Sequence, residues 1–283
     1  MSEARPGERF ALTLDLENDW YLDEPGYDHL TFEYIDEFIA LVDRLSVPLS
    51  VFVVGETLEA YPEAIDRLAT ELDAEFHLHA YDHERGEGDF RTDLGRGKEA
   101  FRNHFGRDPV GYREPYGAIA PEQFPILAEE GFAFDSSVFP SYRPGVYNNL
   151  DSPLEPHPLD GAGGLLEVPV GVFRGARVPF SQNYLKLLGR PLVESVSIAP
   201  LPRTLVYNVH LQDLFRTASL GELPPVKRRI LNRNLDRSPD ILEDTVERLR
   251  SRGYEPTSLT DIASQYSADD RRPHSQPLQR EIR

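Results

Sequence analysis

The chain has 283 residues, a formal charge of −18 and no cysteine. This charge argues against nucleic acid or an anionic membrane surface as a partner. The absence of cysteine excludes disulfides, thiolate nucleophiles and cysteine-bound zinc. No run of about 18 apolar residues is present, so we expect no membrane span. The N-terminus has no basic segment followed by an apolar stretch, so we expect a cytoplasmic protein.

The basic residues are almost all arginine. The chain contains 30 lysines and arginines together, and only Lys98, Lys186 and Lys227 are lysines. An acidic, lysine-poor composition is typical of a salt-accumulating (halophilic) cytoplasm, where ions screen the repulsion between surface carboxylates. The composition therefore indicates habitat and solubility, and it leaves the activity open.

Strands and helices are predicted to alternate along the chain. The segment 9–17 is apolar on both faces, and 49–55 is a β-branched run closed by glycine, so both predict buried strands. Between them, apolar residues at helical spacing end at Pro48. Further strands are expected at 74–80, 110–114, 132–137, 165–171, 204–210 and 254–259, and helices at 61–72, 93–106, 121–130 and 235–252.

This alternation predicts an α/β fold. Strands separated by helices form parallel sheets with right-handed crossovers, and about eight of them favour a closed or partly distorted (β/α) barrel. We expect a single domain over residues 1–266. The stretches 140–164 and 172–203 are rich in Pro, Gly and Asn and are expected to be long loops. Residues 267–283 have few large apolar side chains and are expected to form a disordered tail.

Polar, titratable residues stand at the carboxyl ends of five predicted strands. In a parallel barrel these ends meet on the face that carries the chemistry. Each residue alone could cap a loop, but together they have the composition of a metal hydrolase. The set comprises Asp15, Glu17, His79, His83, Arg113, Asp135 and His210.

Six segments resemble, in order, the motifs of the polysaccharide deacetylase family, also called the NodB-homology domain or carbohydrate esterase family 4. The resemblance covers roughly residues 9–262, and the ordered set is more specific than any one motif. The segments are LTLDLE (12–17), SVFVVG (50–55), HAYDH (79–83), REPYG (113–117), FDSSVFP (134–140) and YNVH (207–210).

The resemblance implies a catalytic metal site. His79 and His83, one helical turn apart, can meet one ion from the same side, and with a carboxylate they leave a position open for water and substrate. The ligand types favour Zn²⁺. His77 points the same way as His79 along a strand, but it precedes the motif and is assigned a supporting role. The remaining histidines are expected on the surface or in loops: His29, His104, His157 and His274.

The resemblance also implies catalytic roles. Asp15 is expected to act as the general base, held ionised by Arg113, and His210 as the general acid that protonates the leaving amine. The backbone N–H of Tyr116 is expected to help bind the oxyanion. Asp135 is expected to raise the pKa of His210.

Three positions depart from the usual family pattern. Leu16 replaces the second of two adjacent aspartates, so the pattern is the Asp-x-Glu form of some branches. We expect Glu17 to be the third metal ligand, because its extra methylene lets it reach back toward the ion; Asp19 is the alternative if the chain turns sharply at Asn18. Ala80 and Asn208 are the other two departures: Ala80 replaces a hydroxyl residue, and Asn208 replaces an apolar residue.

Three functions fit this sequence. The first is a metal-dependent hydrolase that removes an N-acyl group, such as acetyl, from an amino sugar or a glycan precursor. The second is a cyclic-amide or ureide hydrolase of the allantoinase-like branch. The third is a catalytically inactive homologue that still binds carbohydrate.

Overall fold

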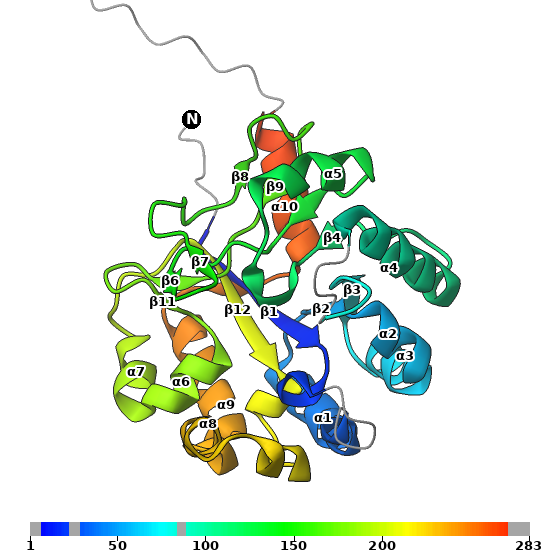
Figure 1. Cartoon of the computed structure of the whole chain (residues 1–283). Helices are drawn as coiled ribbons and strands as arrows, with labels where there is room; N and C mark the ends of the chain where they lie inside the picture. Colours follow the sequence, from blue (N-terminus) through cyan, green and yellow to red (C-terminus); the bar gives the residue numbers. More distant parts are fainter. Residues whose placement is uncertain (1–6, 23–28, 84–88, 271–283) are drawn as a thin grey trace, which may run out of the picture.

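The computed structural model describes residues 7–22, 29–83 and 89–270. Its main sheet has the order β12-β1-β2-β3-β4-β5-β9-β8, and all neighbours are parallel except β8 and β9. The sheet curls into a distorted barrel, with β1 and β12 side by side at its centre (Figure 1). The expected fold class is confirmed. The strands are β1 (Arg9–Leu16), β2 (Leu49–Val53), β3 (Ala74–Leu78), β4 (Gly111–Tyr112), β5 (Phe134–Asp135), β8 (His157–Pro158), β9 (Leu166–Glu167), β12 (Thr204–His210) and β13 (Glu255–Pro256), which pairs with the start of β1.

The chain that follows β9 brings the two sides of the sheet together. The N–H of Gly171 donates to the carbonyl of Val206 in β12 over 2.9 Å. A Cβ on Gly171 would lie 2.5 Å from the Leu205 side chain and 2.8 Å from the Val206 oxygen. Only glycine permits this approach, so Gly171 helps to curl the sheet into a barrel.

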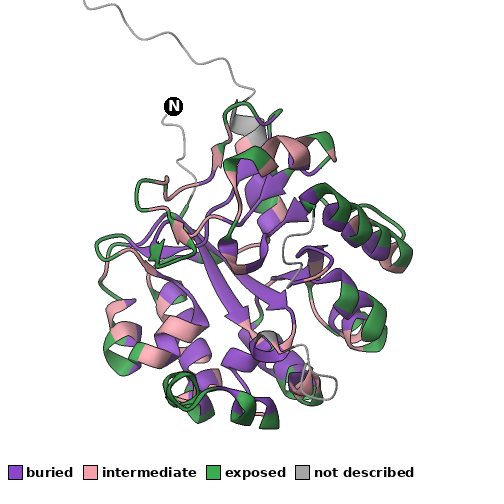
Figure 2. Ribbon diagram, viewed as in Figure 1, coloured by how far each residue is buried: buried purple, intermediate pink, exposed green. Residues whose placement is uncertain are grey.

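Helices cover the outside of the sheet. The inner face of α1, for example, buries Phe38, Leu41, Val42 and Leu45, as the helical spacing predicts. Figure 2 shows a buried sheet surrounded by helices whose outer faces are exposed. These helices are α1 (Ile35–Leu45), α2 (Gly55–Ala60), α3 (Pro62–Glu71), α4 (Phe90–Phe105), α5 (Phe124–Glu129), α8 (Pro225–Leu231) and α9 (Ser238–Ser251). Within the described segments, no helix is long and apolar enough to cross a membrane.

The C-terminal helix α10 (Leu259–Asp270) packs against the barrel interior. Leu259 and Ile262 belong to the same apolar cluster as Phe52 and Phe134. Glu75, near the start of β3, accepts hydrogen bonds from the first two N–H groups of the helix. The helix therefore lies at the amino ends of the strands. Its last residues, 267–270, belong to the segment that was expected to be a disordered tail. The rest of that segment, 271–283, lies outside the described part of the chain.

The two expected loops contain regular structure. The first includes the hairpin β6 (Tyr142–Arg143) and β7 (Tyr147–Asn148). The second includes the hairpin β10 (Val172–Phe173) and β11 (Val178–Pro179) and the helices α6 (Gln182–Leu188) and α7 (Arg190–Ser195). The expectation of a long loop was wrong at 182–195 because two helices of one to two turns give too short a periodic pattern to detect.

Candidate metal centre and active site

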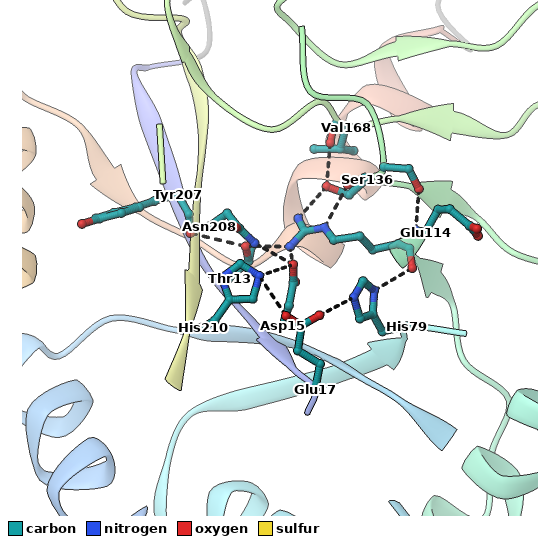
Figure 3. Close-up of polar contacts among 12 residues, drawn as sticks. Thr13, Asp15, Glu17, His79, Glu114, Ser136, Val168, Tyr207, Asn208 and His210 are labelled. Atoms are coloured by element: carbon teal, nitrogen blue, oxygen red, sulfur yellow. Dashed lines mark hydrogen bonds and ion pairs between the residues drawn. The ribbon is translucent and has the colours of Figure 1, made fainter. Parts of the chain in front are cut away.

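Glu17, His79 and His83 form a buried cluster at the carboxyl ends of β1 and β3. One ligand atom of each residue lies within 4.8 Å of the other two. The Oε2 atom of Glu17 is 2.7 Å from Nε2 of His83 and 3.3 Å from Nε2 of His79. Parallel strands bring these residues together because Glu17 follows β1 directly and His79 follows β3, two strands away. Figure 3 shows Glu17 and His79 pointing toward each other.

The cluster has the chemistry of a divalent-metal site. Ligand atoms about 2.1 Å from one tetrahedral ion lie about 3.4 Å apart; the Glu17–His79 distance of 3.3 Å matches this, and the Glu17–His83 distance of 2.7 Å is shorter. The Nδ1–H of His79 donates to the carbonyl of Arg113 over 2.8 Å, which leaves Nε2 as the ligand atom. The side-chain amide of Gln212 donates to the other oxygen of Glu17 over 3.1 Å and orients the carboxylate.

Asp19 is held by a different set of partners. The chain turns after Asn18 into a short helix (Asp19–Tyr21). The Asp19 carboxylate there accepts hydrogen bonds from the N–H and hydroxyl of Thr31 and from the hydroxyl of Ser219. Burial raises the pKa of Asp19 to about 6 despite these donors. The structure thus groups Glu17 with the histidines, whereas Asp19 is hydrogen-bonded to Thr31 and Ser219.

Asp15 and Arg113 form a buried ion pair beside the metal cluster. The Nη1 atom of Arg113 is 2.6 Å from Oδ1 of Asp15, and Asn208 donates to the other oxygen over 2.7 Å. Burial alone would raise the pKa of Asp15, but the charges of Arg113, His79 and His210 lower it below its ordinary value. The Asp15 carboxylate is therefore ionised at neutral pH.

Arg113 is fixed by contacts on every side. Its Nε and Nη2 groups donate to the carbonyl and hydroxyl of Ser136, each over 2.9 Å. Its guanidinium carbon also lies 4.0 Å from the centre of the Phe52 ring. These contacts leave one orientation for the arginine, and that orientation points at Asp15.

His210, at the end of β12, faces both carboxylates. Its Nε2 atom is 3.6 Å from Asp15 and 3.5 Å from Glu17, while Nδ1 is 3.0 Å from Asp213. Burial alone would lower the pKa of His210, but Glu17, Asp213 and Asp15 raise it to about 9. The imidazole is therefore protonated near neutrality. Asp213 is in turn 3.1 Å from the ammonium of the buried Lys186.

Asp135 does not occupy the position expected for it. Its carboxylate accepts from the N–H and hydroxyl of Ser137 and hydrogen-bonds to the buried carboxyl of Glu167. Burial raises the pKa of both carboxyls, and the pKa of Glu167 lies well above its ordinary value. The expectation that Asp135 raises the pKa of His210 is corrected here, because Asp213 is the residue that contacts the ring.

Tyr116 lies in a short helical turn (Pro115–Gly117) after β4. Its φ of 60° is in the left-handed region, which is rare for a residue with a side chain. The Tyr116 ring meets the His83 ring edge-on, with 4.7 Å between the ring centres. The turn therefore places the ring of Tyr116 beside the metal cluster.

A cavity of about 210 Å³ opens over this arrangement. Its floor includes Asp15, Glu17, His79 and His210, and its walls come from three loops. The aromatic side chains on these walls suit the apolar face of a small ring. They are Tyr116, Phe139, Tyr147 and Tyr184.

The other histidines lie away from the cavity. His77 sits between Phe52 and Phe134, with its Nε2 atom 3.0 Å from Glu75. His104 pairs with Asp66 on the outer face, and His157 lies in β8. His29 contacts Thr57 over 3.1 Å, and His274 lies outside the described residues.

Sequence reasoning missed Lys186, Gln212 and Asp213. The signal for Asp213 was its position three residues after His210, where one helical turn brings it back to the imidazole. Gln212 is adjacent to it. Lys186 lies in a helix that was expected to be loop, so no pattern placed it beside the site.

Comparisons with known proteins agree with these motifs. Residues 23–134 match the family model described as polysaccharide deacetylase. A search of the curated proteins finds no match. Among solved structures, a Mycobacterium smegmatis protein assigned to the polysaccharide deacetylases is 20% identical, with a TM-score of 0.63; the match covers 99% of this chain and 97% of that one.

Two further structures have the same fold. A Pseudomonas aeruginosa protein assigned to the polysaccharide deacetylases is 16% identical, with a TM-score of 0.60, and the match covers 94% of this chain and 96% of that one. The allantoinase PuuE is 17% identical, with a TM-score of 0.56, and the match covers 96% of each chain. At these identities the likeness concerns the fold alone.

Proposed function

We infer that this chain is a member of the polysaccharide deacetylase family, whose model matches residues 23–134, and that it is a metal-dependent hydrolase that removes an N-acyl group, acetyl in the first instance, from an amino sugar. The family makes the chain a hydrolase of carbon–nitrogen bonds. The observation that carries the finer proposal is the placement of an ionised Asp15 and a protonated His210 beside the Glu17-His79-His83 cluster.

Glu17, His79 and His83 would hold the ion, and Zn²⁺ suits their nitrogen and oxygen donors. When bound, such an ion supplies a Lewis acid that polarises the acyl carbonyl and acidifies water. Asp15 then accepts a proton from the attacking water, since Arg113 and Asn208 keep its carboxylate ionised and oriented.

The leaving group needs a proton, and His210 is placed to give one. His210 lines the cavity, and Asp213 holds its Nδ1 atom, so the Nε2–H of the imidazolium would donate to the amine nitrogen as the carbon–nitrogen bond breaks. The backbone N–H of Tyr116 would donate to the carbonyl oxygen as charge develops there. Each group performs one role, as amide hydrolysis requires.

The cyclic-amide hydrolase is the second candidate. The observation in its favour is the Asp15-Leu16-Glu17 pattern, which differs from two adjacent aspartates, together with a first cavity of only about 210 Å³. Ring opening of a cyclic ureide releases no acetate, so product analysis separates the two reactions. A homologue that binds carbohydrate without turnover would give neither product.

The direct test is acetate release from N-acetyl sugars by the metal-reconstituted protein. Activity should disappear with a chelator and return with added zinc. The Asp15→Asn variant should keep its bound metal and its fold but lose about 10²- to 10⁴-fold in kcat, the usual contribution of a general base. Full activity in this variant would exclude Asp15 as the base, and absence of acetate release by the reconstituted wild type from every N-acetyl sugar would reject the proposed reaction.

A further inference from the structure

Arg143 lines the active-site cavity but takes no part in the arrangement described above. It also lines a second, adjoining cavity of about 580 Å³. The two cavities share Tyr116, Arg143, Asn183 and His210. A ligand that extends from the first cavity into the second therefore lies beside Arg143.

The β6–β7 hairpin aims Arg143 at the site. Arg143 is paired with Tyr147 across the hairpin, so the two side chains leave the same face. The Tyr147 ring stacks on Phe139, with 6.0 Å between ring centres, and this contact fastens the hairpin to the loop after β5. The guanidinium carbon of Arg143 lies 5.5 Å from the centre of the Tyr116 ring. Since Tyr116 also contacts His83, one aromatic ring joins the guanidinium to the metal cluster.

Arg143 has no carboxylate partner among the described residues, and its contact there is the Tyr116 ring. The carboxylates at the site have other partners: Asp15 pairs with Arg113, Asp213 with Lys186, and Glu17 with the histidines, while Glu114 accepts a hydrogen bond from Tyr112. The second cavity also receives Lys227 and Glu222, whose charges offset each other. Arg143 is therefore a cation at the cavity wall that has no carboxylate partner among the described residues.

This charge stands out against the rest of the molecule. The chain carries a formal charge of −18, which repels anions at long range. Salt at about 0.1 M screens that repulsion beyond about 10 Å, so the nearest cation decides what binds at the cavity. A guanidinium forms paired hydrogen bonds with carboxylate and phosphate alike.

We propose that Arg143 binds an anionic group of the substrate, so the sugar that this site accepts carries a phosphate or a carboxylate in addition to its N-acyl group. The inference rests on the proposed deacetylase function and narrows its substrate class. A neutral sugar would leave the Arg143 guanidinium hydrated, so Arg143 would not increase its affinity.

The test compares three N-acetyl sugars: neutral N-acetylglucosamine, its 6-phosphate, and N-acetylmuramic acid, which carries a carboxylate. Acetate release gives kcat/KM for the wild type and for Arg143→Gln. We expect the wild type to prefer at least one charged sugar. Arg143→Gln should lose about 10- to 100-fold more on that sugar than on the neutral one, as is typical of a charge-assisted hydrogen bond. The charged sugar that the wild type prefers shows whether Arg143 binds a phosphate or a carboxylate.

The matched control is Arg190→Gln, which removes the same charge from an exposed arginine on α7 that pairs with Glu194. Arg190→Gln should leave kcat/KM on all three sugars unchanged. Equal losses of Arg143→Gln on charged and neutral sugars would overturn the inference, and so would an unchanged value on the charged sugars.

A binding measurement separates this inference from the proposed activity. Calorimetry with glucosamine 6-phosphate and with glucosamine on the metal-loaded protein needs no turnover. If glucosamine 6-phosphate binds to the wild type but not to Arg143→Gln, and no N-acetyl sugar releases acetate, the proposed deacetylase activity is rejected and the role of Arg143 is kept. If neutral and charged sugars release acetate equally well, and Arg143→Gln releases it as fast as the wild type, the deacetylase activity is kept and the role of Arg143 is rejected.

Discussion

Asn208 donates a hydrogen bond to the carboxylate of Asp15 over 2.7 Å, from the strand that lies beside β1. The two strands are in register, with Thr13 opposite Asn208 and Asp15 opposite His210. Arg113 occupies the other oxygen of the same carboxylate. The position where the family usually has an apolar residue thus holds a second donor for the proposed base.

The first prediction concerns this donor. Asn208→Leu restores an apolar residue and removes one hydrogen bond to a charged group, which is worth about 1.5–3 kcal/mol. We expect kcat/KM to fall about 10- to 100-fold while metal content stays the same. Asn208→Asp should lose more, because a second carboxylate then faces Asp15. Steady-state kinetics with metal analysis checks both, and unchanged kinetics in Asn208→Leu would show that Arg113 alone positions the base.

The second prediction concerns the partner of His210. Asp213→Asn keeps the size of the side chain but removes the negative charge that pairs with Nδ1 of His210. We expect kcat to fall by at least about 10²-fold, since a general acid contributes about 10²- to 10⁴-fold. Asp135→Asn, which changes a buried carboxyl that does not contact His210, is the matched comparison. A larger loss in Asp135→Asn than in Asp213→Asn would restore the role first expected for Asp135.

The barrel could be predicted from the sequence, and so could the grouping of Glu17, His79 and His83 that the structure shows. Apolar runs, such as the β-branched segment closed by Gly55, and helices with apolar spacing are local signals, and they located β1, β2, β3 and β12. Asp15, Glu17, His79 and His210 follow these strands directly, so the parallel topology alone brings them to one face. Glu17 could also be preferred over Asp19 from side-chain reach.

The partner of His210 could not be predicted in this way. Asp135 ends β5, but this strand has only two residues, and the Ser137 hydroxyl and Glu167 hold its carboxyl. Asp213 reaches the imidazole through a short helical turn after β12 (Leu211–Asp213). Side-chain direction at such turns depends on backbone angles that a strand pattern does not specify.

The third prediction decides which carboxylate binds the metal. Glu17→Gln should lower zinc content sharply, because the charged oxygen between the two imidazoles is replaced by a neutral amide. Asp19→Asn should keep the metal, since its partners Thr31 and Ser219 belong to the neighbouring loops. His77→Ala is a further comparison, and it should also keep the metal. Metal analysis of the purified variants gives the answer, and a metal-free Asp19→Asn would move the ligand to Asp19.

The last prediction uses Glu75, on the side of the barrel away from the site. Its carboxylate is 3.0 Å from Nε2 of His77 and accepts from Ser50 and from the first two N–H groups of α10. Burial alone would raise the pKa of Glu75, but His77 and the hydrogen bonds lower it to about 2. Its ordinary value is 4.5, so the native state favours the ionised form.

A lowered pKa in the folded state stabilises the protein above the unfolded pKa, and that stability is lost as the pH falls toward the folded pKa. Glu75→Gln should therefore lower the free energy of unfolding by up to about 3.5 kcal/mol at pH 7, given about 1.4 kcal/mol per pKa unit. The difference from wild type should shrink steadily between pH 4.5 and about pH 2. Urea unfolding at pH 7, 5, 4 and 3 measures it, with Glu99→Gln on the exposed face of α4 as the control for removing one charge. A difference that stays constant across this range would mean that Glu75 stabilises α10 through its shape and hydrogen bonds, without help from its charge.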